Sequence, residues 1–347
     1  MVILFHLCEA NNGGNRFRQI INHGYMAVDF FFLLSGFVIA YAYDDRWGRM
    51  SVLEFAKRRL IRLHPMVIFG SVFGAALFYF AEGNYFPPIR TTPVGAMLVV
   101  MLVGCTLIPI PPALDIRGWA EMHPLNGPAW SLFFEYIGNA LYATILRRIS
   151  IRVLALLTFV SALFLAHLAI CGKNGDVIGG WSITPEQLHI GFARLLFPFL
   201  AGVLLMRLGK HIRMRGSFLP CSLLLIVALA LPRFGGAGKL WINGLYEALC
   251  ILLLFPLIVA MGAGEQLATG RSLRIARFFG DLSFPLYITH YPLIYIYTAW
   301  IADRQIPVSR AILPGIATLA AALLVAYAAL KLYDEPVRQW LTRHYIR

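Results

Sequence analysis

The sequence predicts an all-α fold, a polytopic transmembrane helical bundle with about ten spans. Hydrophobic residues make up 59% of the 347 residues and charged residues only 14%, whereas soluble domains carry about 25% charged residues. The mean hydropathy is +0.70, and the apolar residues form runs of roughly 20, the length that one helix needs to cross a bilayer. This composition excludes a disordered chain, a disulfide-stapled secreted module and a soluble enzyme.

The chain opens with an apolar segment that is too short to cross a membrane. Residues 1–8 read MVILFHLC, and we expect them to form the outer end of a first helix whose beginning is missing. Nine further spans are predicted from the apolar runs: 24–43, 63–81, 128–146, 151–171, 192–208, 218–232, 241–262, 283–302 and 310–332. No repeat or long linker divides the chain, so residues 1–347 are expected to form one membrane domain with a truncated first helix.

Residues 94–110 form a weaker apolar segment. The chain leaves the membrane outward near Glu82 and re-enters near Pro128, so an even number of crossings must lie between them. We therefore expect 94–110 to be re-entrant or interfacial, because Pro109, Pro111 and Pro112 break its end.

The net charge of +13 comes from Lys and Arg residues that lie between the apolar runs. Twenty of the thirty lie in five segments, 46–62, 147–152, 207–215, 271–277 and 331–347. Cytoplasmic loops collect Lys and Arg, so these segments and the C-terminus are predicted to be cytoplasmic. The charge therefore indicates a lipid bilayer as partner rather than nucleic acid. The five cysteines form no CxxC pair and are interpreted as packing residues, and no metal site is expected.

Four ionisable residues lie in or beside the apolar runs: His6, Asp29, Glu135 and His290. Such residues are costly in a membrane unless they are paired or hydrated, so each is a functional candidate. Helix rise places the first three at a similar depth near the outer side. A histidine beside a carboxylate is typical of a general base. The alternatives are that His6 and Asp29 snorkel to water, that Glu135 belongs to a structural buried pair, and that His290 is a packing residue.

A basic cluster precedes the second complete span. Arg59 and Arg62 are three residues apart, so they share one face of a helix. The planar guanidinium group donates two bonds to a phosphate at once, which favours a phosphorylated cytosolic ligand. The alternative is ordinary anchoring of the cytoplasmic loop. The sequence contains no P-loop, GxGxxG or HExxH motif, which argues against nucleotide hydrolysis, redox chemistry and metalloprotease activity.

These motifs resemble the membrane-bound acyltransferase 3 family of bacterial cell-surface O-acyltransferases. The resemblance rests on six segments in order: Phe5-His6, residues 24–39 (GYMAVDFFFLLSGFVI), 59–62 (RLIR), 130–136 (WSLFFEY), 283–292 (SFPLYITHYP) and 334–338 (DEPVR). The family's essential histidine corresponds to His6 and its paired arginines to Arg59 and Arg62. Further candidates within the matching segments are Ser35, Trp130, Tyr287 and His290.

The resemblance implies transfer of an acyl group, most often acetyl, from cytosolic acyl-CoA to a carbohydrate hydroxyl at the outer face of the bacterial inner membrane. We expect His6, oriented by Asp29 or Glu135, to act as the base, and Arg59 and Arg62 to hold the phosphates of acyl-CoA. No permanently bound cofactor is expected. The alternative is a multi-span transporter of a lipid-linked sugar or small solute. A non-catalytic membrane subunit is a third possibility.

Overall fold

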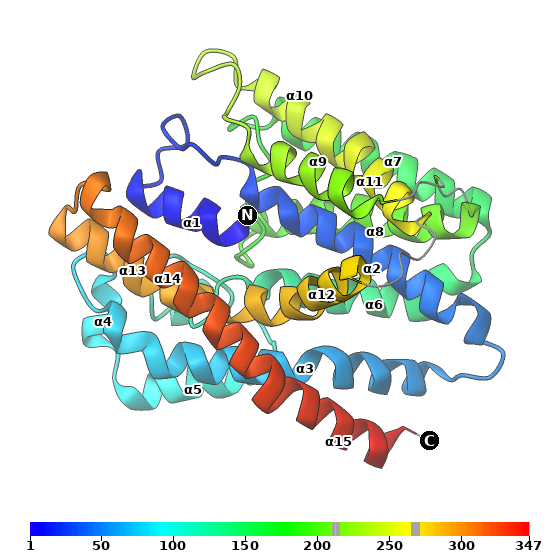
Figure 1. The fold of residues 1–347 in the computed structure, drawn as a ribbon, viewed down its shortest axis with the longest axis horizontal. Coiled ribbons are helices and arrows are strands. Elements are labelled where there is room, and N and C mark those ends of the chain that lie inside the picture. The colour runs from blue at the N-terminus through cyan, green and yellow to red at the C-terminus, as the bar shows by residue number, and fades with distance from the viewer. Residues whose placement is uncertain (210–211, 213–215, 265–270, 347) are drawn as a thin grey trace.

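The computed structural model describes residues 1–209, 212, 216–264 and 271–346, and in these ranges all regular structure is helical (Figure 1), as the sequence predicts. The α-helices are α1 (Val2–Asn11), α2 (Ala27–Tyr43), α3 (Val52–Leu77), α4 (Pro87–Thr91), α5 (Val94–Cys105), α6 (Ala129–Thr144), α7 (Ile151–Cys171), α8 (Pro185–Leu208), α9 (Phe218–Ala230), α10 (Trp241–Leu249), α11 (Phe255–Ala263), α12 (Arg271–Thr289), α13 (Tyr291–Arg304), α14 (Val308–Ala329) and α15 (Glu335–Tyr345). Short π-helical turns join α10 to α11 and α14 to α15.

Six helical stretches of the described chain are long and apolar enough to cross a membrane. They are Gly24–Arg46, Val52–Ala81, Ile151–Cys171, Pro185–Leu208, Trp241–Ala263 and Val308–Tyr345. In α7 only 22% of the apolar window is buried inside the protein, so most of its apolar side chains are left to face lipid. The chain is therefore a membrane protein, and the count of about ten spans remains a prediction.

Helices α2 and α8 pack closely along their length near the centre of the bundle (Figure 1). Two glycines allow this approach: a Cβ atom at Gly36 would collide with the Phe199 carbonyl, and one at Gly202 with the Leu33 carbonyl. Small residues at such contacts let the two backbones approach, which is the usual basis of helix association in lipid. This pair of helices carries Asp29 on one side and Arg194 on the other.

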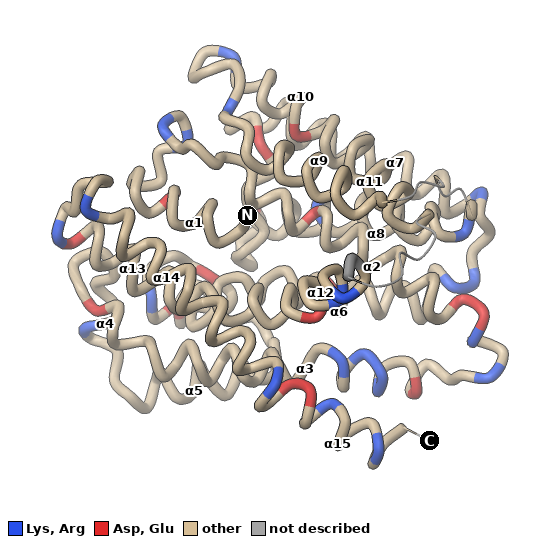
Figure 2. Tube along the Cα trace, viewed as in Figure 1, with Lys and Arg blue, Asp and Glu red and all other residues tan. Residues whose placement is uncertain are grey.

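Helix α3 begins at Val52, well before the predicted start of that span at residue 63. A capping box explains the difference: Glu54 N donates to Ser51 Oγ (3.2 Å) and Ser51 N donates to Glu54 Oε2 (2.8 Å). The basic cluster is therefore helical. Figure 2 shows Lys and Arg gathered at this end of α3 and on α15 beside it, whereas the basic segment 210–215 lies largely outside the described residues.

The predicted span 283–302 is wrong as one continuous helix, because α12 ends at Thr289 and α13 starts at Tyr291. Pro292 lacks the N–H that would bond the Ile288 carbonyl. Asn126 Nδ2 donates to that carbonyl instead, at 3.0 Å. The break therefore leaves His290 at a helix junction and ties it to the segment before α6.

The second part of the segment between α5 and α6, residues 121–128, folds into the bundle, whereas residues 111–114 are exposed. Helix α5 has 12 residues, about 18 Å of helix, which is too short for a 30 Å hydrocarbon core. In the segment that follows α5, residues 106–128, the side chains of Met122, His123, Leu125 and Asn126 are buried. Helix α6 consequently starts inside the protein.

Candidate functional site

Two cavities lie on either side of a shared wall. The histidine cavity has a volume of about 420 Å³, and its lining includes His6, Glu9, Arg16, Trp119, Glu121 and Arg194. The arginine cavity has a volume of about 290 Å³, and its lining includes Ser35, Arg59, Arg62, Ser131 and Glu135. Val28 and Tyr287 line both cavities. The two clusters of functional candidates are therefore separated locally by one layer of side chains.

His6 lies on α1 and is hydrogen-bonded to Glu9, one turn later on the same helix. The distance from His6 Nδ1 to Glu9 Oε2 is 3.0 Å. A carboxylate accepts, so this contact assigns the ring proton to Nδ1 and leaves Nε2 as the basic nitrogen. The expectation that Asp29 or Glu135 orients His6 is corrected by this geometry. The pair could have been predicted from the sequence, because His6 and Glu9 are three residues apart and therefore share one face of a helix.

The rings of His290 and Tyr291 pack around His6. Tyr291 meets the His6 ring edge-on at a centroid distance of 4.7 Å, and His290 stacks at 5.7 Å with an interplanar angle of 27°. His290 Nδ1 lies 2.8 Å from the Tyr287 carbonyl, to which it donates. His290 is 1% exposed and its Nε2 has no hydrogen-bond partner among the described residues. Its contacts are those of a packing neighbour of His6.

Asp29 is fully buried and ion-paired with Arg194 on α8. Arg194 Nη2 lies 2.7 Å from Asp29 Oδ2 and Arg194 Nε lies 3.1 Å from Oδ1. Arg194 also donates to the carbonyls of Tyr25 and Gly179. The snorkelling interpretation of Asp29 is therefore wrong. Arg194, which the sequence analysis missed, was visible as a charge inside the predicted span 192–208, where a counter-ion of Asp29 could be sought.

Trp130 lines the histidine cavity, with the Arg194 guanidinium 5.1 Å from its ring centroid. The indole therefore packs beside the guanidinium of the buried ion pair, and both side chains line the cavity.

Glu135 belongs to the arginine cavity. Its Oε1 accepts from Arg59 Nη2 at 2.9 Å and from Ser35 Oγ at 2.9 Å. The structure places Glu135 and His6 in different cavities, so Glu135 does not contact the histidine as expected. Arg62 lines the same cavity, is exposed, and interacts electrostatically with Asp334 and Arg338 of the C-terminal segment.

Tyr287 forms the wall between the cavities. Its hydroxyl lies 2.8 Å from Ser131 Oγ and 3.2 Å from the Pro128 carbonyl, to which it donates. These contacts fix the phenol at the start of α6 and hold the ring across from Val28.

Glu121 is a site residue that the sequence analysis missed, because it lies in a segment predicted to be outside the membrane helices. Its side chain is buried and lines the histidine cavity. Burial raises the pKa of Glu121 to about 7, although the Tyr295 hydroxyl that donates to it and the nearby Arg117 both act in the opposite direction.

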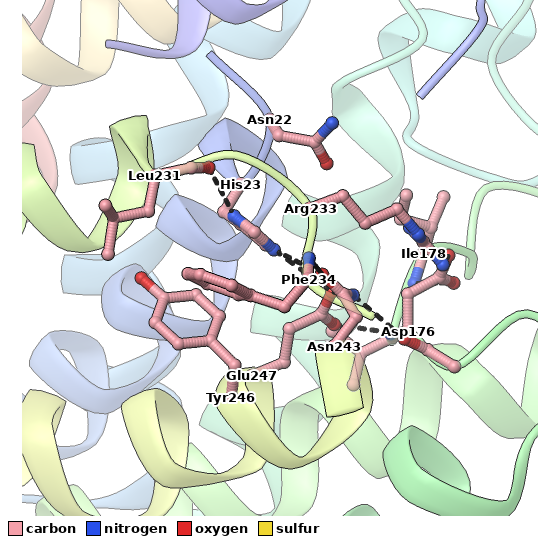
Figure 3. A network of polar contacts seen from close by, with 12 residues as sticks. Asn22, His23, Asp176, Ile178, Leu231, Arg233, Phe234, Asn243, Tyr246 and Glu247 are labelled. Atoms are coloured by element: carbon pink, nitrogen blue, oxygen red, sulfur yellow. Dashed lines mark hydrogen bonds and ion pairs between the residues drawn. The ribbon is translucent and has the colours of Figure 1, made fainter. Parts of the chain in front are cut away.

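A buried polar network lies beside the histidine cavity (Figure 3). His23 Nε2 lies 2.9 Å from Asn243 Oδ1, and Val177 N donates to Glu247 Oε2 at 2.8 Å. Arg16 and Arg233 both bind Asp176, at 2.6 and 2.9 Å. The network joins the segments that precede α2, α8 and α10, and the first two of these supply Arg16, Tyr25 and Ile178 to the cavity wall. Asn243 and Glu247 are polar residues four positions apart in the predicted span 241–262, and this pattern could have indicated the buried network.

A family model and several known proteins match the chain. The sequence model of an acyltransferase domain, acyltransferase 3, matches residues 1–331. Protein 2 in the picA locus of Rhizobium radiobacter is 35% identical over 148 residues, 41% of this chain and 76% of that protein. O-acetyltransferase OatA of Staphylococcus aureus is 24% identical over 350 residues, 97% of this chain but only 55% of that protein.

Acyltransferase MdmB of Streptomyces mycarofaciens is 29% identical over 147 residues, 40% of this chain and 33% of that protein. No solved structure matches the chain significantly.

Proposed function

The chain belongs to the acyltransferase 3 family, and from this premise we propose that it is an O-acyltransferase that moves an acetyl group from acyl-CoA to a carbohydrate hydroxyl. The observation that carries the proposal is the pair of cavities with a common wall of Val28 and Tyr287. One cavity holds a histidine paired with a carboxylate, and the other holds two arginines. The similarity to a protein named O-acetyltransferase supports acetyl as the group and oxygen as the acceptor atom.

The donor binds in the arginine cavity. Arg59 and Arg62 present guanidinium groups, whose planar fork suits the phosphate oxygens of acyl-CoA. Glu135 holds Arg59 in place through an ion pair at 2.9 Å. The slender pantetheine arm then extends past Val28 and Tyr287, so that the thioester reaches the histidine cavity.

The reaction is a direct transfer with His6 as the general base. His6 Nε2 takes the proton of the acceptor hydroxyl, whose oxygen attacks the thioester carbonyl carbon. The carbon–sulfur bond then breaks, and the leaving thiolate takes the proton from the imidazolium. Glu9 stabilises that imidazolium through Nδ1 at 3.0 Å. General base catalysis of this kind contributes roughly 10²–10⁴ in rate.

The acceptor binds in the histidine cavity, which is lined by aromatic side chains including Tyr85, Trp119 and Trp181. Aromatic faces pack against the C–H faces of sugar rings. The basic ends of α3 and α15 favour a cytoplasmic C-terminus in the bacterial inner membrane. The arginine cavity, which lies toward these basic ends, then takes its donor from the cytosol.

The test is acceptor-dependent release of CoA thiol from acetyl-CoA by membranes that contain the protein. We expect release only when a glycan fraction is supplied, and none with His6→Ala. Release that is independent of the glycan would contradict O-acyl transfer, and so would transport of the glycan without release. Radiolabelled acetyl trapped on the protein without acceptor would contradict the direct step.

A further inference from the structure

We propose that Glu121, together with Trp119 and Tyr85, forms an acceptor subsite in the histidine cavity that binds a hydroxyl-bearing ring such as a pyranose. All three side chains line this cavity, and none belongs to a segment that carries the family resemblance. The inference rests on the proposed function and adds the residues that select and orient the acceptor.

Glu121 lies close to Tyr291, which contacts the base. Tyr291 packs edge-on against His6 at 4.7 Å, and both Tyr291 and Glu121 lie beside Gly127. A Cβ atom at Gly127 would lie 2.7 Å from Glu121 Oε1 and 3.0 Å from Tyr291 Cε1. Gly127 also lines the cavity. The carboxyl therefore lies within one side chain of Tyr291, which itself contacts His6.

The backbone before Glu121 is built to hold one conformation. The Asp115 carboxylate accepts from the backbone N–H groups of Arg117, Gly118 and Ala120, at 2.9, 2.8 and 2.7 Å. Ala120 has a φ of +53°, a left-handed conformation that residues with a side chain rarely adopt. Met122 N, on the other side, donates to the Trp181 carbonyl at 2.7 Å. Such over-determined backbone strain is typical of functional sites.

The partners of Glu121 leave it able to accept from a ligand. Tyr295 donates to Oε2, and Oε1 lies beside Gly127, which lines the cavity together with Glu121. Arg117 stacks over the Tyr295 ring at 3.5 Å and donates from Nε to the Pro124 carbonyl at 2.6 Å, so it fixes Tyr295 without pairing with the carboxylate. The free oxygen is therefore an acceptor for a hydroxyl or amide proton.

The aromatic neighbours define the shape of that ligand. Trp119 and Tyr85 meet edge-on at 6.0 Å, and Glu9 lies in the same cavity. A ring that has C–H groups on its faces and hydroxyl donors on its edge satisfies both the aromatic and the carboxylate side chains. A flat anion satisfies neither carboxylate.

The test compares Glu121→Gln with a matched change, Glu82→Gln, in an exposed carboxylate that pairs with Arg90 outside the cavity. Radiolabelled acetyl-CoA is the donor, and the glycan fraction of cells that make the protein is the acceptor. For Glu121→Gln we expect the half-saturating acceptor concentration to rise about tenfold or more, with the acetyl-CoA dependence unchanged. Glu82→Gln should match the wild type.

An unchanged acceptor dependence in Glu121→Gln, or a shift in the acetyl-CoA dependence instead, would overturn the subsite. Trp119→Phe provides a second variant if Glu121→Gln does not fold, and a wild-type acceptor dependence in Trp119→Phe would also overturn it.

Binding of the glycan fraction, measured by tryptophan fluorescence without donor, separates the two proposals. Binding that depends on Glu121 without any acetyl transfer would sink the proposed function and keep the subsite. Acetyl transfer by the protein, together with glycan binding that does not depend on Glu121, would contradict the subsite and keep the proposed function.

Discussion

Replacing Asp29 by asparagine tests whether this carboxylate supports the bundle or the chemistry. Asp29 receives two bonds from Arg194, at 2.7 and 3.1 Å, and both side chains are at most 2% exposed. The substitution keeps the size of the side chain and leaves a buried guanidinium without its counter-ion.

The expected loss follows from the burial of the pair. Removing one partner of a buried ion pair costs about 3–5 kcal/mol, because the remaining charge stays desolvated. Arg194 keeps its bonds to the Tyr25 and Gly179 carbonyls, and asparagine still offers one acceptor, so we place the loss near the lower value, about 3 kcal/mol. The double variant Asp29→Asn/Arg194→Gln removes both charges and should recover a large part of it.

The free energy of unfolding is measured by SDS titration of the purified protein in mixed micelles. Asp45→Asn, a change at an exposed carboxylate, is the matched control. Turnover per folded molecule is measured on the same preparations. Asp29→Asn should lose stability and keep most of that turnover. Unchanged stability, or a double variant less stable than the single one, would refute the argument from the unpaired guanidinium. If Asp29→Asn is as stable as the wild type but has lost its turnover, Asp29 takes part in catalysis.

The remaining predictions concern the two cavities. His6→Ala should lower acyl transfer by roughly 10²–10⁴ without loss of membrane insertion. Glu9→Gln should reduce the transfer less, because it removes the partner of His6 but not the base. CoA thiol release measures both, and unaltered transfer in Glu9→Gln would remove its role as partner of His6. Arg59→Lys and Arg62→Lys should each raise the half-saturating acetyl-CoA concentration and leave that of the acceptor unchanged; unaltered acetyl-CoA dependence in both variants would reduce the pair to topological anchoring. Burial raises the pKa of Glu121 from 4.5 to about 7. Between these two pH values the folded protein therefore keeps a proton on Glu121 that the unfolded chain has already released. The wild type should therefore lose stability relative to Glu121→Gln as pH rises from 4.5 to 7, by at most about 1.4 kcal/mol per pH unit; a difference in thermal midpoint that is constant over this range would contradict it.

Sequence reasoning located most helices because a run of apolar residues long enough to cross a bilayer is a direct consequence of the membrane's thickness. It also selected residues that line the cavities, among them His6, Arg59, Glu135 and Tyr287. The pairing of these residues was less accessible, because it depends on where each helix starts. Glu135 was grouped with His6 by depth, whereas its hydrogen-bond partners are Arg59 and Ser35 in the other cavity.

Partners on other elements were the harder part. Arg194 and Asp29 are 165 residues apart, and no periodicity links two charges over that separation. Glu121 lies in a segment without regular structure, where hydropathy carries no signal for burial. The His290 junction depends on Pro292 and on an asparagine far away in the chain, so the apolar run 283–302 alone indicated one continuous helix.

The inward fold of residues 121–128 also sets an order for biogenesis. Met122 N bonds the Trp181 carbonyl, Asn126 Nδ2 bonds the Ile288 carbonyl, and Gly127 N bonds the Tyr295 hydroxyl. All three partners are synthesised later than the segment itself. An unsatisfied buried polar group costs free energy, so we expect the segment to reach its final place only after α13 has been synthesised. Helices α12 and α13, which are synthesised late, thus complete a wall of the cavity that α1 also lines.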